Sequence, residues 1–278
     1  MEKLKLKVYA KVNLALDILG KFENGYHDLD MLMASVNIFD TMTFNKAKSN
    51  QVKMDGKVVG AENTAVKALE LLSGKYGIHM NVQITKGIPF AAGMGGSSAD
   101  ASGVFVAASK LYDIPLKELE ELAAKVGSDV IYMMYGGFAR VRGQGENIEK
   151  IDLPMMDILI AQLEPGGSTK DVYAEYDKNP TKTRLTIDQA LEQIKKTGRG
   201  FFNVLSDGAI KLCPSIEYSL KDIYAFTDRV FMTGSGSAVV GIFDRERDAK
   251  WCEINLVGYL VAKTLHTMPE GIEVIEEY

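Results

Sequence analysis

The sequence predicts a mixed α and β protein in two parts, and three features of the chain lead to this prediction. Apolar and polar side chains alternate over residues 3–19, as they do in strands. An apolar strand around 82–84 runs through a glycine- and serine-rich loop into a helix that ends at Tyr112. A fresh apolar strand opens after Pro154, where we place the boundary between domains 1–153 and 154–278.

The composition is that of a globular protein with no obvious polyanionic or membrane partner. The 278 residues are 46% hydrophobic and 25% charged, and the net charge is −5. Nucleic-acid binding usually needs a basic field, and a spanning helix needs ~18 consecutive apolar residues, which the chain lacks. Cys213 and Cys252 lack the spacing of a disulfide framework or a zinc site, so we expect reduced, buried thiols. We therefore predict a cytoplasmic protein without a nucleic-acid or membrane partner.

The N-terminal elements can be taken in order from their patterns. Residues 3–19 predict two strands that meet at Ala10-Lys11, and Asn24-Gly25 predicts a hairpin turn. Further strands are expected over 31–44 and 52–59, the latter with a turn over 54–57. A helix over 64–76 follows, with Asn63 as its N-cap.

The loop before the next helix has the residues of an anion cradle. Glycines 93, 95 and 96 allow positive φ and a close approach of backbone N–H groups, and the following helix N-terminus attracts negative charge. Ser97 and Ser98 add hydroxyl groups that suit phosphate oxygens or a metal bound to them. A capped helix after a flexible turn is the plainer interpretation. No Lys follows the serines and the glycine spacing differs, so neither a Walker loop nor a dinucleotide fingerprint is present.

This loop resembles the phosphate loop of the GHMP kinases, the superfamily of galactokinase, homoserine kinase and mevalonate kinase. The resemblance is carried by Ile88-Pro89-x-x-x-Gly93-Met94-Gly95-Gly96-Ser97-Ser98-Ala99. The added glycine and the Asp100-Ala101 pair point to the branch whose acceptor is 4-diphosphocytidyl-2-C-methyl-D-erythritol, in the non-mevalonate isoprenoid pathway. The resemblance implies ATP as the phosphoryl donor and Mg²⁺ held through its phosphates, with Ser98 as a possible ligand and no other direct protein ligand. The residues that it assigns to ATP are Asn63, Lys86, Pro89, Gly93, Met94, Gly95, Gly96, Ser97, Ser98 and Ala99.

Two charged residues match the catalytic positions of that branch. Ala10-Lys11-Val12-Asn13-Leu14 resembles its Ala-Lys-x-Asn-Leu motif, and Gly127-Ser128-Asp129-Val130 resembles its Gly-x-Asp-Val motif. The resemblance implies that Lys11 lies at the centre of phosphoryl transfer and that Asp129 is the catalytic carboxylate. Without it, Lys11 would be a solvent-facing lysine at a sheet edge and Asp129 a helix N-cap.

The acceptor side is matched by an aromatic patch from both parts of the chain. Gly25-Tyr26-His27 resembles the branch's Gly-Tyr-His motif, which implies that Tyr26 stacks on the cytosine and that His27 hydrogen-bonds it. Thr169 is expected to cap a helix whose Tyr173 faces the same base. The implied acceptor residues are Asn13, Tyr26, His27, Asp129, Thr169 and Tyr173. Simple packing of a Tyr-His pair is the alternative.

The remaining elements complete the order of the motifs. Helices are expected over 115–127 and 245–254 and at three places within 186–226, and strands over 158–160, 229–233 and 257–264. The segment Thr233-Gly234-Ser235-Gly236-Ser237 resembles the superfamily's second glycine loop. Departures from the branch pattern fall at Ser97, Ile131, Tyr132, Ser206 and Ser237.

The resemblance implies an α+β fold of two domains, a strand-rich N-terminal nucleotide domain and a ferredoxin-like C-terminal domain. The predicted function is ATP-dependent phosphorylation of a hydroxyl on a cytidine-diphosphate-linked polyol, by a monomer or a homodimer. Three alternatives stay open: a kinase for a sugar, polyol or homoserine, a catalytically silent sensor of the same fold, and a decarboxylase that acts on a diphosphate.

Overall fold

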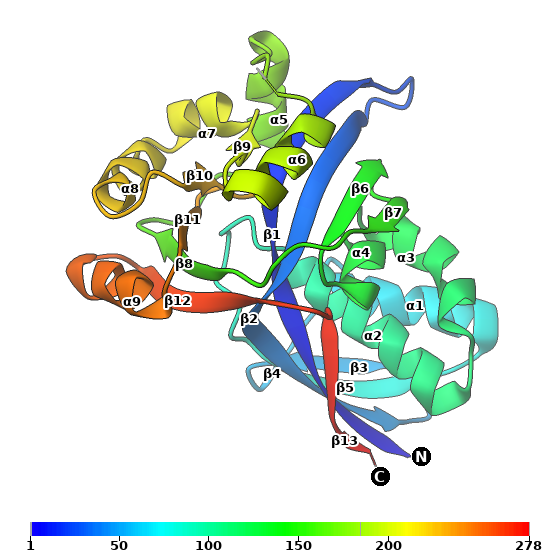
Figure 1. The fold of residues 1–278 in the computed structure, drawn as a ribbon. Coiled ribbons are helices and arrows are strands. Elements are labelled where there is room, and N and C mark those ends of the chain that lie inside the picture. Colours follow the sequence, from blue (N-terminus) through cyan, green and yellow to red (C-terminus); the bar gives the residue numbers. More distant parts are fainter. Residues whose placement is uncertain (1, 184, 278) are drawn as a thin grey trace.

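A computed structural model describes residues 2–183 and 185–277 and has an α+β architecture (Figure 1). The strands are β1 (Lys3–Lys21), β2 (His27–Lys46), β3 (Gln51–Met54), β4 (Lys57–Val58), β5 (Met80–Thr85), β6 (Ala139–Gly143), β7 (Asn147–Lys150), β8 (Asp157–Gln162), β9 (Phe202–Asn203), β10 (Val230–Met232), β11 (Val239–Phe243), β12 (Val261–Met268) and β13 (Ile272–Glu277). The helices are α1 (Thr64–Tyr76), α2 (Gly96–Tyr112), the 3₁₀ turn η1 (Leu116–Leu119), α3 (Glu120–Val126), α4 (Val130–Tyr135), α5 (Thr169–Lys178), α6 (Ile187–Thr197), α7 (Ser206–Leu212), α8 (Ser215–Tyr224) and α9 (Glu246–Asn255).

The long antiparallel pair β1 and β2 runs through the whole molecule (Figure 1). On one side β2 continues into the order β5, β3 and β4, and α1 and α2 pack together in this half. On the other side β12 pairs with β2 and leads to β8, β11 and β10. A continuous sheet therefore links the two halves, and the boundary at Pro154 stays a prediction.

The first strand differs from the prediction of two strands that meet at Ala10-Lys11. It is one strand of 19 residues whose pairing with β2 shifts register between Tyr9 and Ala10. Residues 8–16 are all buried, so this stretch lacks the one exposed face that an alternating pattern indicates. The sequence pattern could not distinguish a bulge in a continuous strand from a break between two strands.

The C-terminal segment also differs from the prediction. Helix α9 lies where it was expected, but β12 begins at Val261 rather than at 257 and continues to Met268. A further strand, β13, was not predicted, and it pairs antiparallel with the start of β1, with Leu4 opposite Glu277 and Val8 opposite Ile272. The two ends of the described chain therefore lie side by side (Figure 1).

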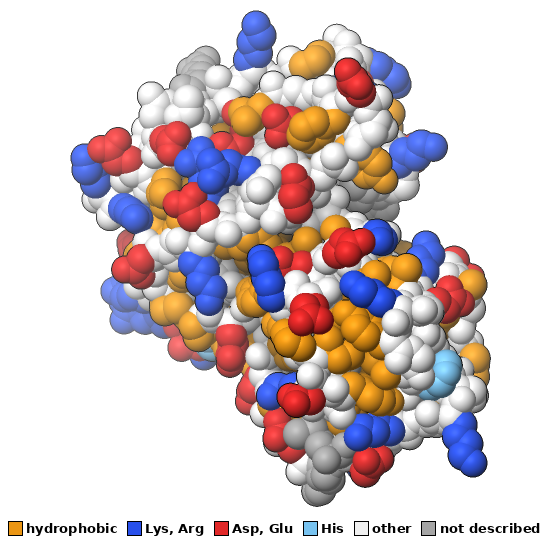
Figure 2. Space-filling view, turned by 90° about the vertical axis from the view of Figure 1, so that its right-hand side faces the viewer, with side chains coloured by type: hydrophobic (Ala, Val, Ile, Leu, Met, Phe, Trp, Pro, Cys, Tyr) orange, Lys and Arg blue, Asp and Glu red, His pale blue; other side chains and the backbone are white. Residues whose placement is uncertain are grey.

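The surface carries both signs of charge. Figure 2 shows one face, on which basic and acidic side chains are interspersed around an apolar area. Over the described residues, no helix has the length and apolar character that crossing a bilayer requires.

Candidate active site

Two glycine loops from opposite halves of the chain meet on β1. The Lys11 N–H donates to the Met94 carbonyl of the first loop at 3.0 Å, and the Asn13 N–H donates to Thr233 Oγ1 of the second loop at 2.8 Å. Gly93 has a φ of +73°, and a Cβ there would lie 2.6 Å from the Thr233 carbonyl oxygen. Because no side chain fits at that distance, Gly93 is what allows the two loops to interlock.

Gln162, at the end of β8, ties the first loop to the C-terminal half, and sequence analysis missed it. Its buried Nε2 donates to the carbonyls of Phe90 at 3.1 Å and Ala91 at 3.2 Å, and to Ser237 Oγ at 3.2 Å. The Ser237 hydroxyl in turn donates to the Glu164 carbonyl. The departure at Ser237 therefore supplies polar contacts at the junction of the loops. A lone glutamine in an apolar strand is a signal of such a buried junction.

A cleft of about 1360 Å³ lies over these loops and brings together residues from both halves. Every predicted site residue lines it except Ala99, which is fully buried in α2. The predicted residues on its walls are Lys11, Asn13, Tyr26, His27, Asn63, Lys86, Pro89, Gly93, Met94, Gly95, Gly96, Ser97, Ser98, Asp129, Thr169 and Tyr173. The cleft is thus large enough for two nucleotide-sized ligands, since small-molecule sites are typically about 300–1,000 Å³.

The centre of the cleft contains an ion pair between Lys11 and Asp129. The Nζ of Lys11 lies 3.3 Å from Asp129 Oδ2 and donates to Asn13 Oδ1 at 2.8 Å. Lys11 is 5% exposed, so the interpretation as a solvent-facing lysine is wrong. Asp129 stands at the N-cap position of α4 but makes no side-chain capping bond. Its carboxylate is therefore available for the ion pair and for a ligand.

Ser98 points toward the turn that carries Asp129. Its Oγ lies 3.8 Å from where a Cβ on Gly127 would be. The serine hydroxyl and the aspartate carboxylate both line the cleft, and both are oxygen donors of the kind that Mg²⁺ accepts beside phosphate oxygens and water. The residues present thus fit a phosphate-bound Mg²⁺. Within the described ranges, no group of three or more His, Cys, Asp or Glu side chains could hold a metal ion by itself.

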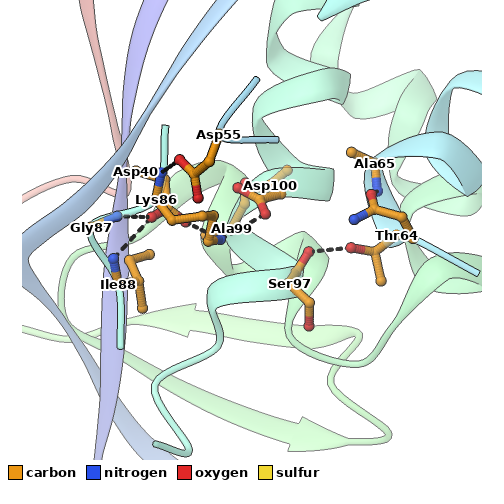
Figure 3. Close-up of polar contacts among 12 residues, drawn as sticks. Asp40, Asp55, Thr64, Ala65, Lys86, Gly87, Ile88, Ser97, Ala99 and Asp100 are labelled. Carbon is orange, nitrogen blue, oxygen red and sulfur yellow. Dashed lines mark hydrogen bonds and ion pairs between the residues drawn. The ribbon is translucent and has the colours of Figure 1, made fainter. Parts of the chain in front are cut away.

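The start of α1 is capped by its own asparagine and contacts the phosphate loop through one hydrogen bond, between Thr64 and Ser97 (Figure 3). The predicted N-cap is confirmed, because Asn63 Oδ1 accepts from the Ala65 N–H at 2.9 Å. The next residue, Thr64, donates its hydroxyl to the Ser97 carbonyl at 2.6 Å. A wall of the cleft is thereby fixed to the serines of the loop.

Behind the loop, Lys86 binds two buried carboxylates, those of Asp40 and Asp100 (Figure 3). Its ammonium donates to Asp100 Oδ2 at 2.7 Å and to Asp40 Oδ2. The other oxygen of Asp40 accepts from the N–H groups of Gly87 at 2.6 Å and Ile88 at 2.9 Å. Asp40 therefore anchors the turn that leads into the loop, a role that its place in a regular strand pattern did not reveal. The predicted contact of Lys86 with ATP stays a prediction.

We expect Asp100 to make stability fall with rising pH. Burial raises the pKa of its carboxyl group from 3.8 to about 7, although the charge of Lys86 opposes the shift. The native state thus binds this proton more tightly than the unfolded chain, so its stabilising effect is complete below about pH 4 and is lost as the pH rises through 7. Asp100→Asn should flatten this decline in the free energy of unfolding, measured with urea between pH 4 and 8.

The matched control is Asp113→Asn, because Asp113 is exposed at the other end of the same helix. This variant should keep the wild-type dependence on pH. An Asp100→Asn protein whose stability still declined as steeply as the wild type would contradict the assignment.

The aromatic patch of Tyr26, His27 and Tyr173 lines the cleft, and the predicted contacts of these residues with a base stay predictions. Tyr173 packs on the His27 ring, with centroids 4.7 Å apart and planes 31° apart, while Tyr26 is 59% exposed at the rim. Burial, and to a lesser extent the charge of Asp129, raises the pKa of Tyr173. His27 Nε2 lies 2.7 Å from Asp177 Oδ1, a partner that sequence analysis missed. Asp177 lies four residues after Tyr173 on a predicted helix, and this spacing, which places both side chains on one helix face, could have identified Asp177 from the sequence.

The predicted helix cap at Thr169 is wrong by one residue. Ser168 is the N-cap of α5, since its hydroxyl accepts from the Asp171 N–H at 3.1 Å. Thr169 is the first helical residue, and its hydroxyl lies 3.0 Å from Ser235 Oγ in the second glycine loop. Serine and threonine are similar caps, so neighbouring Ser and Thr residues left the exact position open.

The structure shows where the other departures from the branch pattern, at Ile131, Tyr132 and Ser206, lie. Ile131 and Tyr132 are buried in α4 behind Asp129, and the Tyr132 hydroxyl donates to the Gly137 carbonyl at 2.7 Å. Burial raises the pKa of Tyr132, so the hydroxyl keeps its proton. Ser206 is the first residue of α7, and both cysteines are buried free thiols, as predicted.

Comparison with known proteins places the chain among kinases of small molecules. Residues 63–137 match the family described as GHMP kinases N terminal domain. A 4-diphosphocytidyl-2-C-methyl-D-erythritol kinase of Lachnospira eligens is 34% identical, over 91% of this chain and 93% of its own length. One of Caldanaerobacter subterraneus subsp. tengcongensis is also 34% identical, over 98% of this chain and 100% of its own.

Solved structures agree with these relatives. A crystal structure of 4-(cytidine 5'-diphospho)-2C-methyl-D-erythritol kinase matches with a TM-score of 0.80 and 27% identity, over 95% of this chain and 99% of that one. A homoserine kinase from Cytophaga hutchinsonii shares the fold, with a TM-score of 0.71 at 16% identity, over 99% of this chain and 98% of its own. The phosphate loop, the ordered motifs and these relatives together show that the chain belongs to the 4-diphosphocytidyl-2-C-methyl-D-erythritol kinase family, a branch of the GHMP kinases.

Proposed function

We propose that this chain transfers the γ-phosphoryl group of ATP to a hydroxyl of 4-diphosphocytidyl-2-C-methyl-D-erythritol. The observation that carries the proposal is the ion pair between the buried Lys11 and the partly exposed Asp129, 3.3 Å apart. Lys11 lies on β1 and also hydrogen-bonds the Met94 carbonyl of the phosphate loop through its backbone N–H. Phosphoryl transfer needs positioning and cancellation of charge more than covalent help from the protein. This combination of loop, cation and carboxylate can supply both.

The roles of the residues follow from their positions. Asp129 accepts the proton of the attacking hydroxyl as its oxygen bonds to the γ-phosphorus and the bond to the β-phosphate oxygen breaks. Lys11 offsets the negative charge that collects between the carboxylate and the phosphoryl group. The backbone N–H groups over Gly93–Ser98 hold the phosphates at the N-terminus of α2. A Mg²⁺ ion held by these phosphates and by Ser98 would supply further charge neutralisation.

Replacing Ser98 with Ala should raise the KM for ATP and lower kcat, because the hydroxyl faces the turn of Asp129 at the phosphate end of the cleft. Steady-state kinetics at saturating acceptor measures both constants. Cys213→Ala and Cys252→Ser are the controls, since both thiols are buried and neither lines the cleft. They should change stability at most. Inactivation by alkylation of either thiol, without unfolding, would contradict this separation.

The acceptor is tested by an ATP-consumption assay with a panel of hydroxyl compounds. The cytidylyl acceptor should be phosphorylated well, whereas free methylerythritol phosphate, which lacks the base, should be a very poor substrate. Galactose, simple polyols and homoserine test the other acceptors of the superfamily. Efficient use of one of these, with the cytidylyl compound ignored, would overturn the acceptor and leave the kinase assignment intact. If none of these compounds supports ATP consumption, a catalytically silent sensor or another reaction would be favoured.

A single small-molecule acceptor fits the cleft, and the predicted monomer or homodimer and the predicted cytoplasmic location stay predictions.

A further inference from the structure

Helix α5 holds the imidazole of His27 from two directions at the acceptor end of the cleft. Tyr173 and Asp177 are four residues apart on α5, so they project from the same face of the helix. The Tyr173 ring packs on the imidazole, and Asp177 Oδ1 lies 2.7 Å from the ring nitrogen Nε2. His27 comes from β2 in the N-terminal half and its side chain is only 11% exposed. The orientation of this histidine is thus determined by a helix of the other half.

The second oxygen of Asp177 is also occupied. Lys21, the cross-strand neighbour of His27 in the pairing of β1 with β2, donates its ammonium to Asp177 Oδ2 at 2.7 Å. These two partners lower the pKa of Asp177, His27 contributing more than Lys21. The carboxylate is therefore ionised and can only accept hydrogen bonds.

This arrangement determines which hydrogen bond the histidine offers to a ligand. Because the Asp177 carboxylate can only accept, Nε2 of the neutral imidazole must carry the proton and donate it to Asp177. The other ring nitrogen, Nδ1, is then unprotonated and accepts hydrogen bonds. Within the described part of the chain, Nδ1 has no hydrogen-bond partner. An unprotonated Nδ1 of His27 attracts the exocyclic amino group of cytosine and repels the carbonyl oxygen that uracil has in its place.

We propose that Asp177 is a positioning residue that gives the enzyme its preference for a cytosine base, by holding His27 in the tautomer whose Nδ1 accepts. The inference rests on the proposed function, because it concerns the base of that acceptor.

The substitution Asp177→Asn tests the proposal. It replaces one of the two carboxylate oxygens, which accept hydrogen bonds, by an amide NH₂ group, which donates them. Lys21 can only donate, so the amide oxygen of Asn turns to Lys21 and the amide NH₂ group turns to His27. Nε2 must then accept, and Nδ1 carries the proton and becomes a donor. We expect the ratio of kcat/KM for the cytidine acceptor to that for its uridine analogue to fall by at least about tenfold.

Two further variants separate this effect from a loss of structure. Lys21→Met leaves the bond between Asp177 and His27 in place, so it should keep the wild-type ratio. In the double variant Lys21→Met with Asp177→Asn, the amide oxygen is free to turn back to His27, so the preference for cytidine should return. A merely structural role of Asp177 predicts no such rescue.

A spectroscopic measurement reads the tautomer without any turnover. In protein labelled with ¹⁵N-histidine, long-range ¹H–¹⁵N correlations distinguish the protonated from the unprotonated ring nitrogen. The chain has three histidines, and a His27→Asn sample assigns the signals of His27. We expect the proton on Nε2 in the wild type and on Nδ1 in Asp177→Asn.

The outcomes distinguish the inference from the proposed function. If the wild type phosphorylates neither nucleotide acceptor, the proposed function fails. If it prefers the cytidine acceptor but Asp177→Asn leaves both the ratio and the tautomer unchanged, the inference on Asp177 is overturned and the proposed function stands. Equal use of both acceptors by the wild type would likewise overturn the inference.

Discussion

Replacing Asp129 with Asn should lower kcat by about 10²–10⁴ while the affinity for ATP stays nearly unchanged. The amide has the shape of the carboxylate but cannot take the proton of the acceptor hydroxyl. The phosphate loop should stay intact, because the ion-pair partner of the Asp129 carboxylate is Lys11 of β1, at 3.3 Å, and not a residue of the loop. Single-turnover kinetics gives the chemical rate, and titration with a non-hydrolysable ATP analogue gives the affinity.

The control for this variant is Asp152→Asn, which removes an exposed carboxylate outside the cleft. It should retain wild-type rates. An Asp129→Asn enzyme that kept more than half of the wild-type kcat would rule out Asp129 as the proton acceptor.

Replacing Lys11 with Met should lower kcat by about 10²–10³, the range found when one preorganised charge-stabilising donor is removed. Lys11 is buried at the point where β1 meets the phosphate loop, and its ammonium bridges Asn13 and Asp129. Methionine fills the same volume without the charge. Rapid-quench measurement of phosphoryl transfer gives the loss directly, and Lys11→Arg should recover part of the rate because it keeps the cation.

The double variant of Lys11 and Asp129 tests whether the two residues act as a unit. Groups that serve one step give strongly non-additive losses, so the double variant should be about as slow as the slower single variant. Losses that multiplied would mean that the ammonium and the carboxylate act independently. The shared role proposed for the pair would then be wrong.

Local patterns were sufficient for most of the helices and for the phosphate loop. The predicted helix over 64–76 has the observed bounds, because Asn63 caps it and Gly77 ends it with a φ of +67°. The loop over Gly93–Ser98 was predicted because glycines and a helix start suit an anion whatever lies around them. These features depend on residues that are neighbours in sequence, so the sequence records them directly.

Contacts across the fold were not predictable in the same way. Asp40 and Asp177 are ordinary acidic residues in their own elements, and each acquires its role from a partner 46 or 150 residues away along the chain. Burial of β1 over 8–16 removed the alternation that would have shown its continuity. The resemblance supplied the residues that are predicted to touch ligands, whereas the residues that hold these side chains in place needed the three-dimensional structure.

Because β13 comes from the C-terminal end of the chain, the edge of β1 that it covers stays unpaired during most of translation. Among the described strands, only β9 and β13 cover this edge of β1. Their residues emerge roughly 200 to 270 positions later, which takes about ten seconds to a minute at ~5–20 residues per second. An uncovered edge is a template for pairing with another nascent chain, and lysines on it oppose such pairing. Lys5 and Lys7 stand on this stretch, and in the finished protein they bind Glu276 at 3.5 Å and Glu273 at 3.0 Å. We expect Lys5 and Lys7 to oppose aggregation at this edge during synthesis. Once β13 has been synthesised, the same two lysines stabilise its pairing with β1.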